Sequence, residues 1–349
     1  MTTDILTRID GHAGIISLNR PSALHALTLD MVHAMTETLL KWQSSRKVKC
    51  IIIDHAEGRG FCSGGDIAFL RTSALNDGGK AGRQFFYAEY QLNHLLFTYP
   101  KPVVAFMDGV CMGGGVGISQ PARFRVATEN TRFAMPETGI GLFPDVGGGW
   151  YLSRLEGRVG QFLALTGARV AGPGCLELGL ATHYLPTEAL ADAKSRIATE
   201  DIERIDGILG TLSVTPPPSK IVETLFDINR HFASDRFEDI FASLDGDDSN
   251  WAMRELATLR GKSPQTCKVA LRQLATSAGL TDFADNMAME YRIGSRVLVR
   301  PDFAEGVRAV IIDKDNAPKW DPATPEGVTD DLLDAIFAPL PPEEEWRPL

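Results

Sequence analysis

The strongest constraint on the fold is a repeated order of segments, in which a short apolar strand leads into a glycine-rich loop and then a helix. The apolar run VKCIIID (48–54) precedes GRGFCSGGDI (58–67), and PVVAFM (102–107) precedes DGVCMGGGVG (108–117). A short, continuous apolar run is typical of a strand that is buried on both faces of a sheet. Glycines after it allow a positive φ and a close approach of the backbone to a ligand. The order predicts a core of strands and helices with both loops at strand ends.

Patterns elsewhere extend this core. Residues 5–19 alternate apolar and polar side chains around DGHAG (10–14), which predicts a β-hairpin. Residues 25–45 carry apolar side chains at helical spacing, with Thr28 as a suitable N-cap. After the prolines of TPPPSK (215–220), successive segments have the pattern of amphipathic helices. We expect a core at residues 1–200 and a helical C-terminal region at residues 201–349 that covers the site or mediates assembly.

Charge and cysteine usage restrict the partners and the compartment. The net charge of −10 argues against nucleic acid as the main partner. The N-terminus lacks the pattern of a secretory signal, and no run of 18 apolar residues predicts a membrane span. Histidines occur singly and without HExxH spacing, so we expect no metal. Scattered cysteines without CxxC spacing are typical of buried thiols in a reducing compartment, and we expect a cytoplasmic protein. They are Cys50, Cys62, Cys111, Cys175 and Cys267.

The glycine-rich loops do not match the common nucleotide-binding or hydrolase motifs. The run GGGVG does not have the GxGxxG spacing of dinucleotide sites, and the chain contains neither GxxxxGK[ST] nor GxSxG. Two interpretations remain for these loops. They are tight turns that allow close helix packing, or they aim free backbone N–H groups at an anionic ligand, as an oxyanion hole does.

A third stretch, FAMPETGIGLFPDVGGGW (133–150), places two acids in apolar surroundings. Glu137 and Asp145 each follow a proline, and the stretch contains neither Lys nor Arg. Burial raises the pKa of a carboxyl group and turns it into a better acid or base near neutral pH. The non-catalytic interpretations are a loop or capping acid for Glu137 and a helix N-cap for Asp145.

These motifs, in this order, resemble the crotonase (enoyl-CoA hydratase/isomerase) superfamily. The resemblance rests on the two glycine-rich loops, on the stretch at 133–150 and on DFAEGVRAVIIDKD (302–315), and it covers most of the chain. It implies an α/β fold, a crotonase-like spiral of ββα units with a helical C-terminal region. It also implies acyl-CoA thioesters as substrates, no separate cofactor because coenzyme A is part of the substrate, and assembly into trimers or hexamers.

The resemblance also assigns roles at the thioester. It maps the two oxyanion N–H groups onto Gly65 and Gly114. Hydratases of the family use two glutamates, of which one matches Glu137 while the other is replaced here by Gly117. Asp145 is an acid where hydratases carry a small residue. This exchange, with EYQLNHLL (89–96) and MEYR (289–292), favours the branch that hydrolyses short 3-hydroxyacyl-CoA thioesters such as 3-hydroxyisobutyryl-CoA.

Three further residues are implied to bind the substrate. The segment at Ser63 would approach the CoA adenine, Asp66 follows an oxyanion glycine and is also a candidate helix cap, and Glu89 would belong to the acyl pocket. The alternative for Glu89 is a solvated helix face. His25 stands where the family often has Asn, and a packed loop histidine is the simpler explanation. Hydration or isomerisation of an enoyl-CoA and non-catalytic binding of acyl-CoA remain as other functions.

Overall fold

The computed structural model describes residues 2–349, which form two compact units, each assembled from separate stretches of chain. The first unit contains the chain up to Gly65, Gln91–Ala134 and Arg169–Val222. The second contains Asp66–Tyr90, Met135–Ala168 and Glu223–Leu349. We expected a boundary after residue 200, and this position falls inside a stretch of the first unit. The two units are not the core and the C-terminal region that we expected, and that division stays a prediction.

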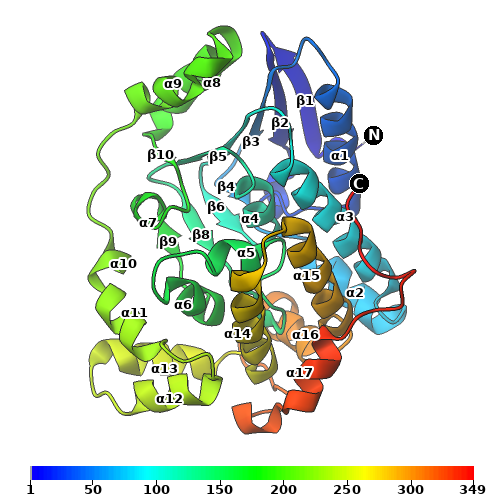
Figure 1. The fold of residues 1–349 in the computed structure, drawn as a ribbon, viewed down its shortest axis with the longest axis vertical. Helices are drawn as coiled ribbons and strands as arrows, with labels where there is room; N and C mark the ends of the chain where they lie inside the picture. The colour runs from blue at the N-terminus through cyan, green and yellow to red at the C-terminus, as the bar shows by residue number, and fades with distance from the viewer. Residues whose placement is uncertain (1) are drawn as a thin grey trace. The chain divides into compact units, whose positions relative to one another are not determined.

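The strands belong to the first unit and form two sheets (Figure 1). The larger sheet has the order β1-β2-β3-β5-β7-β10, and the smaller one has the order β4-β6-β8-β9. The strands are β1 (Ile5–Asp10), β2 (Ala13–Leu18), β3 (Cys50–His55), β4 (Gly60–Cys62), β5 (Val103–Met107), β6 (Val110–Met112), β7 (Phe124–Ala127), β8 (Arg132–Ala134), β9 (Val170–Ala171) and β10 (His183–Tyr184).

The helices fall into three groups. In the first unit lie α1 (Leu29–Gln43), α4 (Gly114–Ser119), α7 (Gly172–Glu177), α8 (Leu190–Thr199) and α9 (Ile205–Leu212). In the second lie α2 (Ile67–Asn76), α5 (Gly148–Leu152), α6 (Val159–Thr166), α11 (Leu225–His231), α12 (Phe237–Asp245), α13 (Asn250–Arg260), α14 (Pro264–Gly279), α15 (Phe283–Val297), α16 (Pro301–Val307) and α17 (Asp330–Phe337). The division between the units cuts α3 (Lys80–Phe97) and α10 (Lys220–Glu223).

From β3 to β8, each pair of successive strands contributes one strand to the larger sheet and one to the smaller sheet. In β3–β4, β5–β6 and β7–β8 the first strand joins the larger sheet and the second joins the smaller one. Helix α2 follows β4, and α4 follows β6. The spiral of ββα units is therefore confirmed. The predicted hairpin is also confirmed, because β1 and β2 pair antiparallel from Ile5 opposite Leu18 to Asp10 opposite Ala13.

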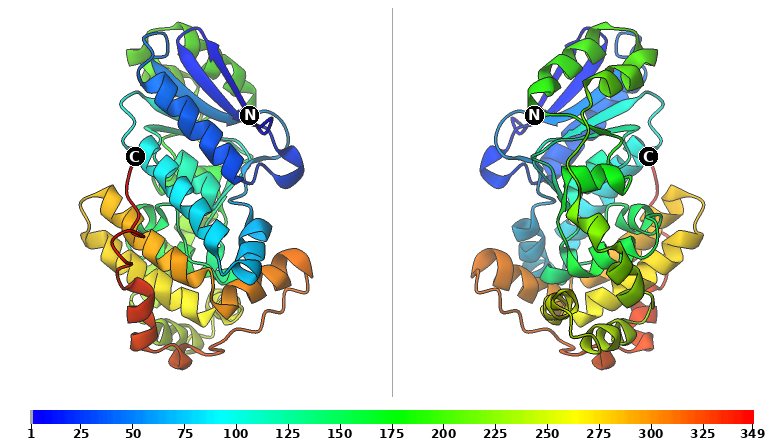
Figure 2. Two further views of the ribbon diagram at one scale, coloured as in Figure 1. Left: turned by 90° about the vertical axis from the view of Figure 1, so that its right-hand side faces the viewer. Right: turned by 90° about the vertical axis from the view of Figure 1, so that its left-hand side faces the viewer.

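Helices cover both faces of the larger sheet (Figure 2). On one face, Ile52 and Val104 pack with Ile197 of α8 and other apolar side chains of α8 and α9 in one buried cluster. On the other face α1 lies against β2, where a Cβ on Gly14 would stand 2.5 Å from the Trp42 ring. Thr28 is the N-cap of α1, as predicted, and its hydroxyl accepts a hydrogen bond from Met31 N–H.

The two glycine-rich loops lie side by side in the first unit, each at a strand end. A Cβ on Gly115 would stand 2.4 Å from the carbonyl oxygen of Cys62, and a Cβ on Gly64 would stand 3.8 Å from the nitrogen of Gly114. The first of these distances is shorter than any real Cβ contact, so only glycine allows the loops to approach this closely. Close packing of the loops, one of our two interpretations, is therefore confirmed, and it leaves a ligand role possible.

This contact predicts unequal effects for two Gly→Ala substitutions in helices. We expect Gly115→Ala to destabilise the fold by about 1–3 kcal/mol, because the methyl group must displace backbone atoms. We expect Gly207→Ala in α9 to stabilise it by about 0.5–1 kcal/mol, because a Cβ there has nothing within 4 Å and alanine is the better helix former. Urea unfolding of both variants measures the difference, and equal effects would contradict the packing of the loops.

Candidate active site

Glu137 is the first residue of a 3-10 helix, Glu137–Ile140, that follows Pro136 in the second unit. The turn ends at Gly141, which has a φ of 70° and lies so close to Asp302 that a Cβ would stand 2.2 Å from its carbonyl oxygen. The side chain of Glu137 is 5% exposed, and its Oε2 has no hydrogen-bond partner among residues 2–349. A buried, unpartnered carboxylate oxygen is costly, so this group is arranged for something other than stability.

Asp145 is buried as well, and it receives a hydrogen bond from a tyrosine. Its Oδ2 accepts from the hydroxyl of Tyr90 at 2.8 Å. The residue does not cap the helix that follows it, because α5 has Gly147 as its N-cap, with no side-chain hydrogen bond. The N-cap interpretation of Asp145 is therefore wrong, and its carboxylate is available for another role.

Glu89 is another buried acid of the second unit. It lies on α3, is 2% exposed, and its Oε1 has no partner among the described residues. The solvated helix face that we considered for Glu89 is therefore wrong.

The pKa values of all three acids are raised, and the charge of Asp145 contributes to the rise at both glutamates. Burial, and then the charge of Asp145, raise the pKa of Glu137 well above its ordinary value. Burial and the charges of Asp145 and Glu137 do the same to the pKa of Glu89. Burial raises the pKa of Asp145 to about 7, against the opposing effect of the Tyr90 hydrogen bond. Like charges in a dry environment oppose one another, so ionisation of one of these acids disfavours ionisation of the others.

Two buried residues of this neighbourhood were missed by sequence reasoning. Tyr90 holds Asp145, and Glu290 accepts hydrogen bonds from the backbone N–H groups of Gly147 and Gly149 at 2.7 and 3.0 Å. Both lie in motifs that carried the family resemblance, EYQLNHLL and MEYR. Those motifs were a signal that these positions matter, but they did not show what the side chains contact.

The remaining predicted residues lie at the glycine-rich loops. Within the first unit Gly65 forms a parallel bridge with Leu27, and Gly114 is the first residue of α4, where a backbone N–H has no intrahelical acceptor. The hydroxyl of Ser63 donates to the carbonyl oxygen of Ala23 at 3.1 Å, so this hydrogen bond explains its position without a ligand. At the start of the second unit, Asp66 is the N-cap of α2. Its predicted capping role is thus confirmed.

His25 and the cysteines near these loops have structural explanations. The Nδ1 atom of His25 accepts from the backbone N–H of Arg20 at 2.9 Å, and its Nε2 lies 2.8 Å from the carbonyl oxygen of Glu57. A packed loop histidine is therefore confirmed. All five cysteines are buried, and burial raises the pKa of Cys111 to about 12, which keeps its thiol protonated.

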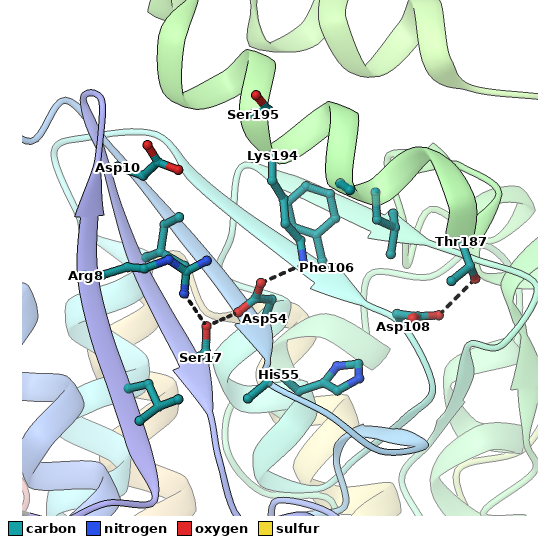
Figure 3. A pocket seen from close by; sticks show the side chains of 15 residues that line it. Arg8, Asp10, Ser17, Asp54, His55, Phe106, Asp108, Thr187, Lys194 and Ser195 are labelled. Atoms are coloured by element: carbon teal, nitrogen blue, oxygen red, sulfur yellow. Dashed lines mark hydrogen bonds and ion pairs between the residues drawn. The ribbon is translucent and has the colours of Figure 1, made fainter.

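A cavity of about 630 Å³ in the first unit differs from the site of the buried acids in the charges that line it (Figure 3). Two of its charged side chains pair, because Lys194 Nζ lies 2.6 Å from Asp54 Oδ2, and Ser17 links Asp54 to Arg8. Asp108, the first residue of the second glycine-rich loop, lines the cavity, but the loop glycines and the stretch at 133–150 do not. Paired charges of this kind are typical of a polar surface hollow, whereas the unpartnered acids of the second unit indicate chemistry.

Among residues 2–349, no group of three or more His, Cys, Asp or Glu side chains is placed to hold a metal ion. No helix in this range is long and apolar enough to cross a membrane.

Comparison with known proteins identifies relatives over nearly the whole length. A family model described as enoyl-CoA hydratase/isomerase matches residues 13–337. The chain is 41% identical to the mitochondrial 3-hydroxyisobutyryl-CoA hydrolase of Danio rerio, over 97% of this chain and 90% of the relative. It is also 41% identical to the human protein of that name, over 97% of this chain and 89% of the relative.

Solved structures agree on the fold but carry other names. A protein described as a carnitinyl-CoA dehydratase from Mycobacterium thermoresistibile matches with a TM-score of 0.92 and 37% identity over 98% of both chains. A protein described as an enoyl-CoA hydratase from Rhodobacter sphaeroides matches with a TM-score of 0.92 and 34% identity, over 99% of this chain and 100% of that one. All these names refer to reactions of acyl-CoA thioesters.

The raised pKa of Asp145 predicts that its charge destabilises the fold as pH rises. Because the folded-state pKa of about 7 exceeds the ordinary 3.8, the folded protein binds the proton more tightly, and stability falls as pH rises through this window. Between pH 5 and pH 8 the loss is about 2–3 kcal/mol. Asp145→Asn should therefore gain stability relative to the wild type on going from pH 5 to pH 8.

Denaturant unfolding at both pH values measures this difference, with Asp285→Asn at an exposed position as the control. A relative stability of Asp145→Asn that is the same at pH 5 and pH 8 would show that Asp145 titrates normally.

Proposed function

Because this chain belongs to the enoyl-CoA hydratase/isomerase family, we propose that it hydrolyses the thioester of a short 3-hydroxyacyl-CoA, with 3-hydroxyisobutyryl-CoA as the substrate. The products are 3-hydroxyisobutyrate and CoA, as in valine breakdown. The observation that carries this proposal is the pair Glu137 and Asp145, two buried acids with raised pKa values, in a chain that is 41% identical to hydrolases of this name.

In this proposal Glu137 acts at the thioester carbonyl. As a general base it takes a proton from water, the water oxygen bonds to the acyl carbon, the C–S bond breaks, and the sulfur leaves as a thiolate that takes up the proton. As a nucleophile it bonds to the acyl carbon itself, expels the thiolate and forms a mixed anhydride that water then cleaves. Its unpartnered Oε2 suits both routes, because no protein group competes for this oxygen.

The oxyanion that develops at the carbonyl needs donors, and we assign them to the N–H groups of Gly65 and Gly114. The side-by-side packing of their loops supports this assignment, since it brings two glycine backbones close together. Each preorganised donor of this kind is typically worth about 3–4 kcal/mol in the transition state. Ser63 and Asp66 adjoin Gly65, and we propose that this segment binds the CoA portion.

Asp145 and Glu89 are proposed to recognise the acyl group. A substrate hydroxyl donates to a carboxylate, and Asp145 either takes this role for the 3-hydroxyl or shares a proton with Glu137. Glu89 has a free Oε1 and belongs to the same group of interacting acids, so it serves the same pocket.

Hydration or isomerisation of an enoyl-CoA is the second candidate function, and the names of the two similar solved structures favour it. The glycine at position 117 argues against it, because the second glutamate that hydratases use to position water is absent. Non-catalytic acyl-CoA binding is the third candidate. It gives no reason to bury three acids at the cost of stability.

We further propose, from the family resemblance, that the chain assembles as a homo-oligomer, a trimer or a hexamer. A cytoplasmic location is proposed from the scattered, buried cysteines, although the relatives named above are mitochondrial. Size-exclusion chromatography with light scattering tests the first proposal, and cell fractionation tests the second.

The substrate assignment predicts a strong preference for the 3-hydroxyl group. We expect thiol release from 3-hydroxyisobutyryl-CoA with a kcat/KM roughly 100-fold above that for isobutyryl-CoA, because a buried acid loses its partner when the hydroxyl is missing. A thiol reagent follows the reaction, with crotonyl-CoA in the same panel. Turnover of crotonyl-CoA alone would replace hydrolysis by hydration, and no turnover of any acyl-CoA would favour the binding protein.

The proposed role of Glu137 predicts that Glu137→Gln loses most of its thioesterase activity. We expect kcat to fall by roughly 10³-fold, because both routes require its carboxylate and the amide is neither a base nor a nucleophile. Glu255→Gln, outside the group of three acids, is the matched control. A loss of less than tenfold in Glu137→Gln would exclude both routes.

A single turnover in oxygen-18 water then separates the two routes. Label in Glu137 supports the anhydride, whereas label confined to the product supports direct delivery of water.

A further inference from the structure

Glu290 is a fully buried carboxyl group on α15 that accepts hydrogen bonds from four N–H donors. Its Oε2 accepts from Gly147 N–H at 2.7 Å, and its Oε1 accepts from Gly149 N–H at 3.0 Å. The side-chain amides of Gln273 and Asn286 also donate to Oε1, each at 2.9 Å. Burial raises the pKa of Glu290 to about 8, while these donors favour its charged form.

The hydrogen bonds around Glu290 also extend to the residue that precedes Asp145. The Nε2 atom of Gln273 donates to the carbonyl oxygen of Pro144 at 2.7 Å, in addition to Glu290. Pro144 directly precedes Asp145, and Gly147 follows it by two residues. Gln273 and Glu290 therefore hold the backbone on both flanks of the aspartate. Asn286 is itself fixed, since its Oδ1 accepts from the hydroxyl of Ser277 at 2.7 Å.

The backbone between these contacts has an unusual conformation. Val146 has a φ of 53°, in the left-handed region that β-branched residues avoid, and Gly147 follows with a φ of 91°. A Cβ on Gly149 would stand 2.5 Å from Ser277 Oγ, so α14 leaves little free space beside the segment. Such a conformation persists only where surrounding contacts determine it. The N–H groups of Gly147 and Gly149 are the points where Glu290 supplies those contacts.

We propose that Glu290, together with Gln273, is a positioning residue that fixes the segment Asp145–Gly149 and so keeps the Asp145 carboxylate on the hydroxyl of Tyr90. Glu290 acts through Asp145 and does not contact the reacting atoms. This inference rests on the proposed function, in which Asp145 serves the hydrolysis of the thioester.

A purely structural role for Glu290 would be to satisfy the N-terminus of α5. That role explains the bonds from Gly147 and Gly149, but it does not explain the link through Gln273 to Pro144, which lies before Asp145 and outside the helix. The network is therefore organised around the aspartate rather than around α5, a helix of only five residues.

A double-mutant cycle tests whether Glu290 acts through Asp145. In Glu290→Gln the new NH₂ group faces N–H donors that need an acceptor, so at least one of these hydrogen bonds is lost. We expect kcat to fall by roughly 100-fold, because Asp145 is displaced. The KM for 3-hydroxyisobutyryl-CoA should change much less. In the Asp145→Asn background the same substitution should lower kcat by less than about threefold, since effects on one unit are not additive.

If Glu290→Gln lowers kcat by the same factor in the wild type and in Asp145→Asn, the proposal is overturned. An unchanged kcat in the single variant Glu290→Gln would overturn it as well. Glu238→Gln, the same substitution at a carboxylate that pairs with Lys268, is the matched control and should retain the wild-type kcat. If Glu290→Gln does not fold, Gln273→Met removes the link to Pro144 and should show the same dependence on Asp145.

Hydrogen exchange gives a readout that does not depend on activity. In Glu290→Gln we expect the amides of Gly147 and Gly149 to exchange roughly tenfold faster or more, while the core amides of α14 keep their protection. Unchanged protection at both glycines would overturn the proposal even if the enzyme were inactive on every acyl-CoA. A wild-type protein without thioesterase activity, but with the expected exchange, would instead overturn the proposed function alone.

Discussion

Burial of three carboxyl groups close together is the constraint on which the rest of the second unit depends. Glu89, Glu137 and Asp145 are each at most 5% exposed, and the pKa of each is raised. The partial compensation comes from a neutral hydroxyl, that of Tyr90, and from the more distant charge of Lys262, which lowers the pKa of Glu137. The surrounding fold must therefore stabilise an arrangement that is unfavourable by itself. Sites with this property are commonly functional, because shifted pKa values are what acid and base chemistry near neutral pH requires.

The backbone around the acids explains why glycine and proline are frequent in this stretch. Gly141 is required where the chain passes against Asp302, and Gly147 adopts a φ that other residues avoid. Glu290 and Gln273 then fix the turn by hydrogen bonds to its backbone. The first unit shows a different use of charge, because Lys194 and Asp54 in its cavity pair with each other. Among residues 2–349, the buried acids that lack a cationic partner at hydrogen-bond distance belong to the second unit.

The sequence predicted those parts of the structure that depend on local patterns. Apolar runs predicted β3 and β5, and the capping preference of threonine located the start of α1. The family resemblance implied the ββα spiral and drew attention to Glu137 and Asp145. The resemblance placed Glu89 in the acyl pocket, but the helical pattern alone left a solvated face open, because α3 carries apolar side chains on more than one side of the helix. Tyr90 and Glu290 were missed because their partners lie 55 and 143 residues away along the chain. Pairings at such separations leave no periodic pattern in a single sequence.

Burial keeps part of this group of three carboxyl groups protonated at neutral pH, in the state that acid and base chemistry requires. Infrared difference spectroscopy, wild type minus Asp145→Asn, measures it directly through the C=O stretch of the protonated carboxyl group. We expect a band from protonated Asp145 at pH 5 that disappears as pH rises through about 7. A difference spectrum that shows only ionised carboxylate throughout this range would contradict it.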